Sequence, residues 1–311
     1  MILSIVIPVF NSEHTLYHLV ERLYTVLSEQ NIEVILVNDG SKDASEAICL
    51  RLVKKFDNVK VISLRRNFGE FNAVMCGLNH ISGDYCVIID DDDQNPPEEI
   101  LKLLHKAQER DYDVVYSDYG DKKHSSIRNI GSNLVNWMTT WLIDKPKGLY
   151  LSSFKLLKAE VVKEIIQYKG PHPYIDALIL RITRHIGTIH VAHSERANGR
   201  SNYTWVKLIS LFMTILFGFS IRPLRLLTLI GFVLMLCSIV LIIGEAFYSL
   251  MTSHIPHTDH VIWLSFLILT SIQFFGMGML GEYLGKMFMS QTGMPQYSIR
   301  FIKQRDDRKT T

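Results

Sequence analysis

The sequence predicts an α/β protein in which residues 1–202 form a mostly parallel sheet covered by helices, followed by membrane segments. Two observations carry this prediction. Apolar strands alternate with helical segments between residues 2 and 90, which is typical of a parallel sheet with helices on both faces. Near the C-terminus, two uncharged apolar runs are each long enough to cross the hydrocarbon core of a bilayer.

The predicted strands and helices follow one another at short intervals. Strands are expected at 2–10, 33–37, 59–63 and 85–90, and helices at 12–28, 43–56 and 69–80. Ligands of such sheets bind beyond the carboxyl ends of the strands. Polar residues gather at three of these ends, in segments 8–11, 38–41 and 90–94. We therefore expect the functional site at this edge of the sheet.

The most informative segment is a run of four carboxylates, Asp90–Asp93, which follows an apolar strand and precedes Gln94-Asn95-Pro96-Pro97-Glu98. Clustered acids raise one another's pKa values, and a bound cation relieves the repulsion. Carboxylate and amide oxygens suit Mg²⁺ or Mn²⁺, which often bridge a protein carboxylate to a substrate phosphate. A solvated acidic turn is the alternative, but the position at a strand end favours the cation site.

Composition excludes several other classes of protein. The 311 residues carry a net charge of only +2, so no nucleic-acid partner is expected. The four cysteines lack CxxC spacing and are predicted to be reduced. The first strand lacks the features of a signal peptide. No GxGxxG follows this strand and no GxxxxGK[ST] occurs, which disfavours a dinucleotide dehydrogenase or a P-loop NTPase.

Membrane spans are predicted at about 226–245 and 261–282. The linker 252–260 has no Lys or Arg, whereas the flanks of the pair are basic, so both termini are expected in the cytoplasm. Residues 203–222 are interpreted as an amphipathic helix lying in the membrane interface. A third span at 208–221 is the alternative, but it is short and would send the basic tail outside.

These features divide the chain into a sheet domain, an interfacial helix, a membrane region and a basic cytoplasmic tail. The predicted bounds are 1–202, 203–222, 223–285 and 286–311.

Several motifs together resemble the signatures of family-2 inverting glycosyltransferases of GT-A fold. They are Ile7–Asn11, Val37–Ser41, Arg66–Gly69, Asp90–Glu98, and Arg196-x-x-Gly199-x-Ser201-x-Tyr203. With two C-terminal spans, the whole chain resembles the polyprenyl-phosphate glycosyltransferases, which include dolichol-phosphate mannose synthase and bacterial undecaprenyl-phosphate sugar transferases. The resemblance implies transfer of a sugar, with inversion, from a nucleotide sugar (a UDP-sugar favoured) to a membrane polyprenyl phosphate such as undecaprenyl phosphate. It further implies a multi-pass protein of the inner or plasma membrane, with a role in envelope polysaccharide or glycan modification.

The resemblance also assigns roles to individual residues. The residues implied to bind the nucleotide are Pro8, Asn11, Asp39 and Asp90, and those implied to bind Mg²⁺ or Mn²⁺ are Asp90, Asp92 and Gln94. Asp91 and Asp93 occupy variable positions of the motif and are expected to be solvated bystanders.

Two arginines are candidates for phosphate binding. Arg196 is implied to contact the diphosphate or the acceptor phosphate, because a guanidinium matches phosphate oxygens in a bidentate way; a surface arginine in a turn is the alternative. Gly199, Ser201 and Tyr203 would form an acceptor loop beside it. Arg128 is implied to lie toward the acceptor phosphate, with a helix-capping role as the alternative.

The chain departs from the family pattern at Ser153, where many members carry an acidic residue, and at Lys155, where they carry arginine. A phosphate monoester has a second pKa near 6, so the acceptor is itself a nucleophile at pH 7. We therefore expect direct displacement at the anomeric carbon without an obligatory side-chain base. Asp92 and Arg196 would stabilise the leaving diphosphate, which makes them the principal catalytic candidates.

Two rival functions share this sequence pattern. A processive polysaccharide synthase has the same core, but the Arg-Trp pair of such enzymes is absent here. A catalytically inactive membrane scaffold is the rival from another class, and the acidic motif argues against it. Gly281-x-x-x-Gly285 could pack helices between subunits, so a dimer or tetramer is a further expectation.

Overall fold

The computed structural model describes residues 1–120, most of 140–192, scattered positions between 229 and 251, and residues 259–291 and 295–305. Its strands are β1 Ile2–Val9, β2 Asn31–Asn38, β3 Val59–Leu64, β4 Tyr85–Ile88, β5 Val114–Asp118, β6 Lys155–Lys158, β7 Ile186–His190 and β8 Ile299–Gln304. Its helices are α1 Leu16–Val26, α2 Ser45–Lys55, α3 Glu70–Leu78, α4 Glu99–Arg110, α6 Ala159–Ile165, α7 Ile175–Ile182 and α10 Asp259–Gln291.

The described strands form one sheet in the order β7-β5-β6-β4-β1-β2-β3-β8. The central strands β4, β1, β2 and β3 are parallel to one another, and β7 is parallel to β5. β6 and β8 are antiparallel to the strands they join. The predicted α/β class with a mostly parallel sheet is confirmed, and every predicted element up to residue 90 has its counterpart at nearly the predicted position.

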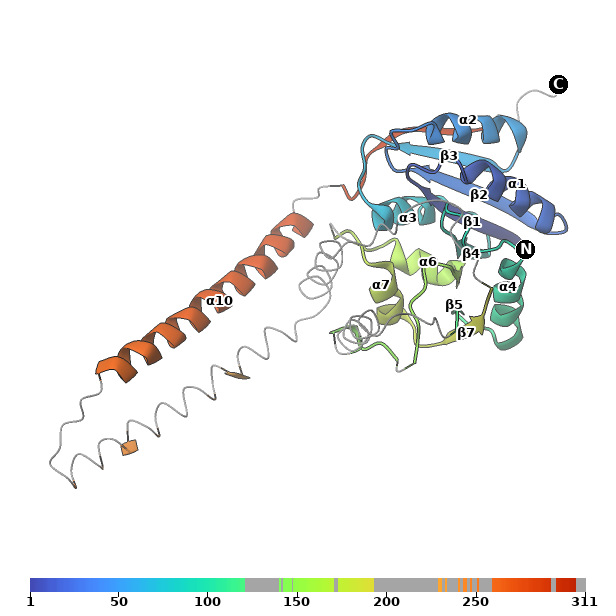
Figure 1. Cartoon of the computed structure of the whole chain (residues 1–311). Helices are drawn as coiled ribbons and strands as arrows, with labels where there is room; N and C mark the ends of the chain where they lie inside the picture. The colour runs from blue at the N-terminus through green and yellow to red at the C-terminus, as the bar shows by residue number, and fades with distance from the viewer. Residues whose placement is uncertain are drawn as a thin grey trace.

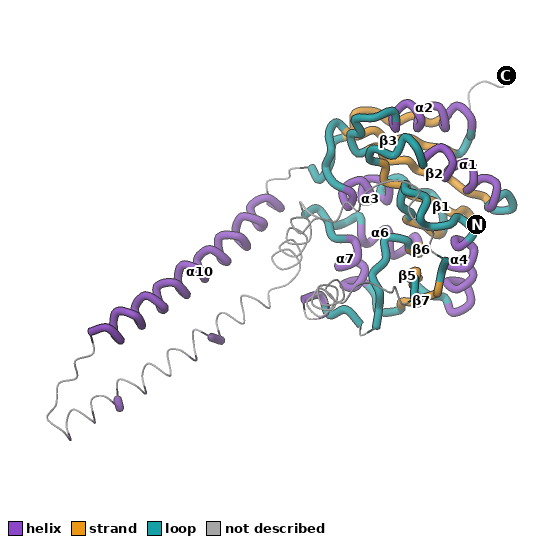
Figure 2. Tube along the Cα trace, in the orientation of Figure 1, coloured by secondary structure: helices purple, strands orange, loops and turns teal. Residues whose placement is uncertain are grey.

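Helices cover both faces of this sheet (Figures 1 and 2). One buried cluster contains side chains of α3, α6 and α7, and the other contains side chains of α1, α2 and α4. Val6 belongs to the first cluster, whereas Ile5 and Ile7 belong to the second, because successive residues of a strand point to opposite faces. The continuous apolar run of β1 is thus explained by burial on both sides.

Three of the cysteines behave as predicted. Cys49, Cys76 and Cys86 are buried and carry free thiols. Burial raises the pKa of the Cys49 and Cys76 thiols to about 12, which keeps them protonated and unreactive.

The C-terminal helix α10 extends away from the α/β domain (Figure 1). It is 33 residues long and contains the segment 261–282 that was predicted as a span. In the part of the chain that the structure describes, no helix is at once long and apolar enough to qualify as a membrane crossing. The segment 203–222 and most of 226–245 lie outside the described residues.

The segment 286–311, expected to be only a basic tail, contains structure that the sequence analysis missed. Helix α10 continues to Gln291, and β8 joins the edge of the sheet beside β3. The sheet domain therefore includes residues from both ends of the chain. Ile299 and Phe301 alternate with Arg300, which is a strand-like pattern. The basic residues of this segment led instead to the prediction of a tail.

Helix α3 packs so closely on the sheet that Gly77 has no room for a side chain. A Cβ atom there would lie 2.4 Å from Val6 Cγ1. We predict that Gly77→Ala lowers the free energy of unfolding by about 1–3 kcal/mol in chemical denaturation, because overpacking outweighs the helix propensity of Ala. The double variant Val6→Ala/Gly77→Ala should lose less free energy of unfolding than the two single variants lose together, because the smaller side chain at position 6 leaves room for the new methyl group. Equal losses, with no coupling between the two positions, would contradict this packing.

Candidate active site

Three loops meet at one edge of the sheet because the strands that precede them are adjacent and parallel. β1 lies between β2 and β4, and Pro8 is paired in register with Val37. The predicted polar segments 8–11, 38–41 and 90–94 follow these strands, so the structure brings them together. Pro8 itself is buried at the end of β1.

Asp91 joins the acidic loop to the loop after β1. Its Oδ2 accepts a hydrogen bond from the backbone N–H of Phe10 at 2.9 Å and another from the hydroxyl of Ser12. The hydroxyl of Thr15 donates to the Asp91 carbonyl oxygen at 2.6 Å. The expectation that Asp91 is a solvated bystander is therefore wrong: the side chain organises the loops on either side of β1.

Asp93 is also engaged with protein groups and is not simply solvated, contrary to expectation. Its carboxylate lies 3.1 Å from His18 Nδ1 and 3.5 Å from an Arg22 nitrogen. Arg22 in turn donates two hydrogen bonds to Glu98, at 3.0 and 2.7 Å. Asp93 thus faces α1, and the four consecutive carboxylates divide between different partners.

Asp39 connects the loop after β2 to the start of α3. Its two carboxylate oxygens accept hydrogen bonds from the backbone N–H groups of Phe68 and Gly69, at 2.7 and 2.9 Å. The residue is only 2% exposed. Burial raises the pKa of Asp39, although the two backbone hydrogen bonds oppose that effect. Each oxygen keeps a further lone pair that a ligand can use.

Gly40 and Asn11 allow these loops to approach one another. Gly40 has a φ of +65°, and a Cβ atom there would lie 2.7 Å from backbone atoms of Arg66 and Asn67. Asn11 has a φ of 56°, and its Oδ1 accepts from the backbone N–H of Lys42 at 2.9 Å. Glycine is required at the first position, and asparagine tolerates the left-handed conformation at the second.

Asp90 and Asp92 take different positions in the acidic loop. The hydroxyl of Ser153 donates to Asp90 Oδ2 at 2.5 Å, which links the loop to the segment before β6. Asp92 Oδ1 accepts from the backbone N–H of Gln94 at 3.3 Å. The sequence departure at Ser153 therefore replaces an acidic side chain with a hydroxyl that orients Asp90.

Negative charge accumulates around this loop. Burial raises the pKa of Asp91 to about 6, and the charges of Asp90 and Asp92 add to the effect. The sequence analysis missed Glu70, at the start of α3. Although this residue is exposed to solvent, the protein around its carboxyl group and then the charge of Asp90 raise its pKa to about 7, with Lys155 opposing.

The side chains of the acidic loop are suited to bind a divalent cation whose remaining ligands come from a substrate phosphate. Among the described residues, no three His, Cys, Asp or Glu side chains converge into a ready-made metal site. Asp90, Asp92 and Gln94 carry side-chain oxygen atoms at the edge of the sheet, next to Asp91, whose pKa is raised by burial and then by the charges of Asp90 and Asp92. Mg²⁺ is commonly bound in this way, by one or two carboxylates together with phosphates.

A buried ion pair joins Lys155, at the start of β6, to Asp176 in α7. The hydroxyl of Tyr116 also donates to Asp176, at 2.8 Å. Lys155 is paired in register with Ile88, the last residue of β4. The lysine that replaces the family's arginine is thus paired with Asp176 in the protein interior, opposite the end of β4.

The remaining predicted site residues cannot be located in this arrangement. Arg128, Arg196, Gly199, Ser201 and Tyr203 all lie outside the described residues.

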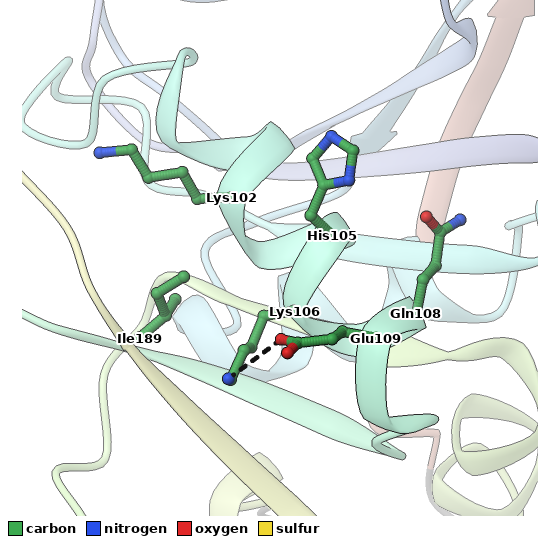
Figure 3. A pocket seen from close by; sticks show the side chains of 6 residues that line it. All are labelled: Lys102, His105, Lys106, Gln108, Glu109 and Ile189. Carbon is green, nitrogen blue, oxygen red and sulfur yellow. Dashed lines mark hydrogen bonds and ion pairs between the residues drawn. The ribbon is translucent and has the colours of Figure 1, made fainter.

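A surface hollow beside α4 is separate from the site (Figure 3). It is lined by Lys102, His105, Lys106, Gln108, Glu109 and Ile189. None of the residues predicted to bind a ligand lines it. Lys106 and Glu109 pair with one another within it, at 3.2 Å.

Comparison with known sequences identifies relatives along nearly the whole chain. Residues 4–158 match the model of glycosyl transferase family 2. A protein of Photorhabdus laumondii called undecaprenyl-phosphate 4-deoxy-4-formamido-L-arabinose transferase is 34% identical, with 96% of this chain and 93% of that protein covered. A Proteus mirabilis protein of the same name is 35% identical over the same shares.

The solved structures support the fold. Glucosyl-3-phosphoglycerate synthase from Mycobacterium tuberculosis, in complex with Mn²⁺, UDP-glucose and phosphoglyceric acid, superimposes with a TM-score of 0.52 at 19% identity. The match covers 68% of this chain and 76% of that one. The same enzyme in complex with UDP gives a TM-score of 0.51.

The contacts of Asp91 and Asp93 predict different consequences of removing them. Asp91→Ala leaves the Phe10 N–H and the Ser12 hydroxyl without their acceptor, so the free energy of unfolding should fall by about 1–3 kcal/mol. Asp93→Ala removes a partly exposed ion pair and should cost about 0–1 kcal/mol. Denaturant titration of both variants tests this difference. Equal stability of the two would contradict the role given to Asp91.

Proposed function

The chain belongs to glycosyl transferase family 2, and on that premise we propose that it transfers a sugar from a nucleotide sugar to undecaprenyl phosphate with inversion. One observation carries the choice of acceptor. Relatives that share about a third of their residues over 96% of the chain are called undecaprenyl-phosphate transferases. The similarity thus extends beyond the sheet domain into the C-terminal part.

The donor would bind where the three loops meet. Asp39, Asn11 and Pro8 would contact the nucleoside, and Asp90 the nucleotide or its cation. A UDP-sugar is favoured because solved structures of the same fold hold UDP or UDP-glucose. The loops are held together by protein hydrogen bonds, so the donor meets a largely preformed surface.

Asp90, Asp92 and Gln94 would hold a divalent cation, Mg²⁺ or Mn²⁺. When bound, such an ion neutralises the diphosphate and makes it a better leaving group. The Ser153 hydroxyl orients Asp90 toward this task.

The acceptor phosphate would act as its own nucleophile. Ser153 is occupied with Asp90 and offers no base. The acceptor is largely dianionic at pH 7, so positioning it is the main requirement. Arg196 and Arg128 would bind the two phosphate groups, with Gly199, Ser201 and Tyr203 forming the loop around the acceptor.

The proposal also assigns the C-terminal part to the membrane that carries the acceptor, with spans at about 226–245 and 261–282 and an interfacial helix at 203–222. Helix α10 carries no charged residue between 261 and 281. Its large apolar side chains are exposed, among them Ile262, Phe266, Phe275, Met277 and Leu284. Such a surface fits contact with lipid.

The position of β8 supports the proposed topology. β8 pairs with β3, so residues on either side of the C-terminal helices belong to one sheet. An even number of crossings allows this pairing, whereas a third span at 208–221 would separate the two strands. The proposed site of action is therefore the cytoplasmic face of the inner membrane. The proposed sheet domain comprises residues 1–202 together with β8. Self-association through α10 is a further part of the proposal.

The proposed activity is tested with the detergent-purified full chain, undecaprenyl phosphate, Mn²⁺ or Mg²⁺ and a panel of nucleotide sugars. The panel should include UDP-linked 4-deoxy-4-formamido-L-arabinose, the sugar in the relatives' name. Mass analysis of the lipid fraction should reveal one sugar per carrier. A polymer would favour a processive synthase, and absence of any product would favour an inactive scaffold.

Removal of a proposed cation ligand should abolish most of the activity. Asp92→Ala is expected to lower kcat/KM by about a hundredfold or more, because the charge on the leaving diphosphate is no longer neutralised. The Mn²⁺ concentration needed for half-maximal rate should rise. Asp93→Ala is the matched control and should stay within about threefold of the wild type. Near-normal turnover of Asp92→Ala would contradict the cation site.

The absence of a side-chain base predicts a simple pH profile. The rate should rise between about pH 5 and 7 as the acceptor phosphate loses its second proton, and then stay flat. Ser153→Ala should reduce kcat by less than about tenfold, because only the orientation of Asp90 is loosened. A collapse of the rate in this variant, with the same flat profile in the wild type, would show that Ser153 has an essential catalytic role.

A further inference from the structure

The strand β8 returns to the sheet after α10 and brings an arginine close to the nucleotide-binding turn. Lys60 through Leu64 of β3 pair with β8, and the N–H of Arg65 donates to the Ser298 carbonyl at 2.9 Å. The backbone of β8 is thus joined to β3 along its length. Arg300 lies within this strand, next to Phe301, which pairs with Ser63.

Arg300 binds two polar side chains of the sheet domain. Its guanidinium forms an ion pair with Glu46 in the first turn of α2. The same nitrogen donates to the hydroxyl oxygen of Ser63 at 3.2 Å. Ser63 is completely buried, whereas Arg300 and Glu46 are partly exposed.

Glu46 connects Arg300 to Asn38, the last residue of β2. The oxygen that meets Arg300 also accepts from the amide of Asn38 at 3.0 Å and from the hydroxyl of Ser63 at 2.7 Å. The other end of the Asn38 side chain, Oδ1, accepts from the backbone N–H of Ser41 at 3.2 Å. Ser41 Oγ accepts from the N–H of Asn11 at 3.1 Å. A continuous series of hydrogen bonds therefore runs from β8 to the turn that contains Asp39.

The centre of this network, Asn38 and Ser63, is buried and has almost no contact with solvent. Asn38 is 1% exposed, so its amide must find partners within the protein. Burial raises the pKa of Glu46, but the hydrogen bonds of Ser63 and Arg300 and the charge of Arg300 outweigh it and leave that pKa below its ordinary value. Arg300 thus favours the ionised form of Glu46 and binds it directly, and Glu46 in turn binds Asn38.

We propose that Arg300 is a positioning residue for donor binding, which acts through Glu46 and Asn38 to fix the turn 38–41. This inference rests on the proposed function of that turn. It makes the strand beyond α10 part of the donor site's support, so that detachment of β8 would weaken nucleotide binding. A simple edge contact would stabilise the sheet without any selective effect on the donor.

The residue just beyond β8 offers a matched control. Arg305 pairs with Asp57, and both side chains are largely exposed. Arg305→Gln removes an arginine next to β8 without touching Glu46, Ser63 or Asn38. Arg300→Lys keeps a positive charge opposite Glu46 and serves as the conservative variant.

The test compares steady-state kinetics of the full-length variants with the nucleotide sugar varied. Arg300→Gln should raise the KM for the donor about tenfold, because this is the change expected from the loss of one hydrogen bond to a charged group. The kcat should stay within about twofold of the wild type. Glu46→Gln should act alike, and the double variant should add little. Arg300→Lys should recover part of the loss, and Arg305→Gln should match the wild type.

Hydrogen exchange provides a readout that does not need activity. In Arg300→Gln, the amides of 39–42 should exchange faster, with α4 unchanged. Kinetics of Arg300→Gln identical to those of Arg305→Gln, with equal exchange at 39–42, would overturn the proposal. A wild-type protein without transferase activity would overturn the proposed function, while the exchange result would still decide whether Arg300 supports the turn.

Discussion

The carboxylates of Asp39 and Asp91 hold together the loops that the sheet brings to one edge, and the rest of the site depends on these contacts. Parallel strands place the loops side by side, but only hydrogen bonds between them fix their geometry. Asp39 binds the start of α3, and Asp91 binds the loop after β1. Asp39 is buried and Asp91 is partly buried, so these bonds tie the loops to one another, with Asp90 and Asp92 at the edge of the sheet.

This arrangement gathers carboxylates at one edge of the sheet. Desolvation by the surrounding protein, and then the charge of neighbouring carboxylates, raises the pKa values of Asp91 and Glu70 to about 6 and 7. A divalent cation shared with a diphosphate would offset part of the negative charge of both groups, which is consistent with the number of carboxylates in the loops. Under the proposed function, a membrane-bound C-terminal part would deliver the acceptor, and β8 would connect that part to the turn 38–41 through Arg300.

The sequence predicted the order of strands and helices because their periodicity is local. It also placed the site at the strand ends, since parallel topology alone requires this. The family resemblance separated Asp92 from Asp91, but it did not reveal the contacts that Asp91 makes, because those depend on what the folded loops offer each carboxylate. Nor could it find β8 or the Lys155–Asp176 pair, whose partners are brought together by tertiary packing between distant segments. Glu70 looked like an ordinary helix start until the structure placed Asp90 near it.

The central claim is that the acidic loop binds a nucleotide diphosphate through a cation. Calorimetric titration of the purified full chain with UDP, with Mn²⁺ and then with excess chelator, tests it most directly. The account predicts measurable binding with Mn²⁺ and a loss of affinity of at least about tenfold without it. UDP binding of equal strength in both conditions would contradict the account.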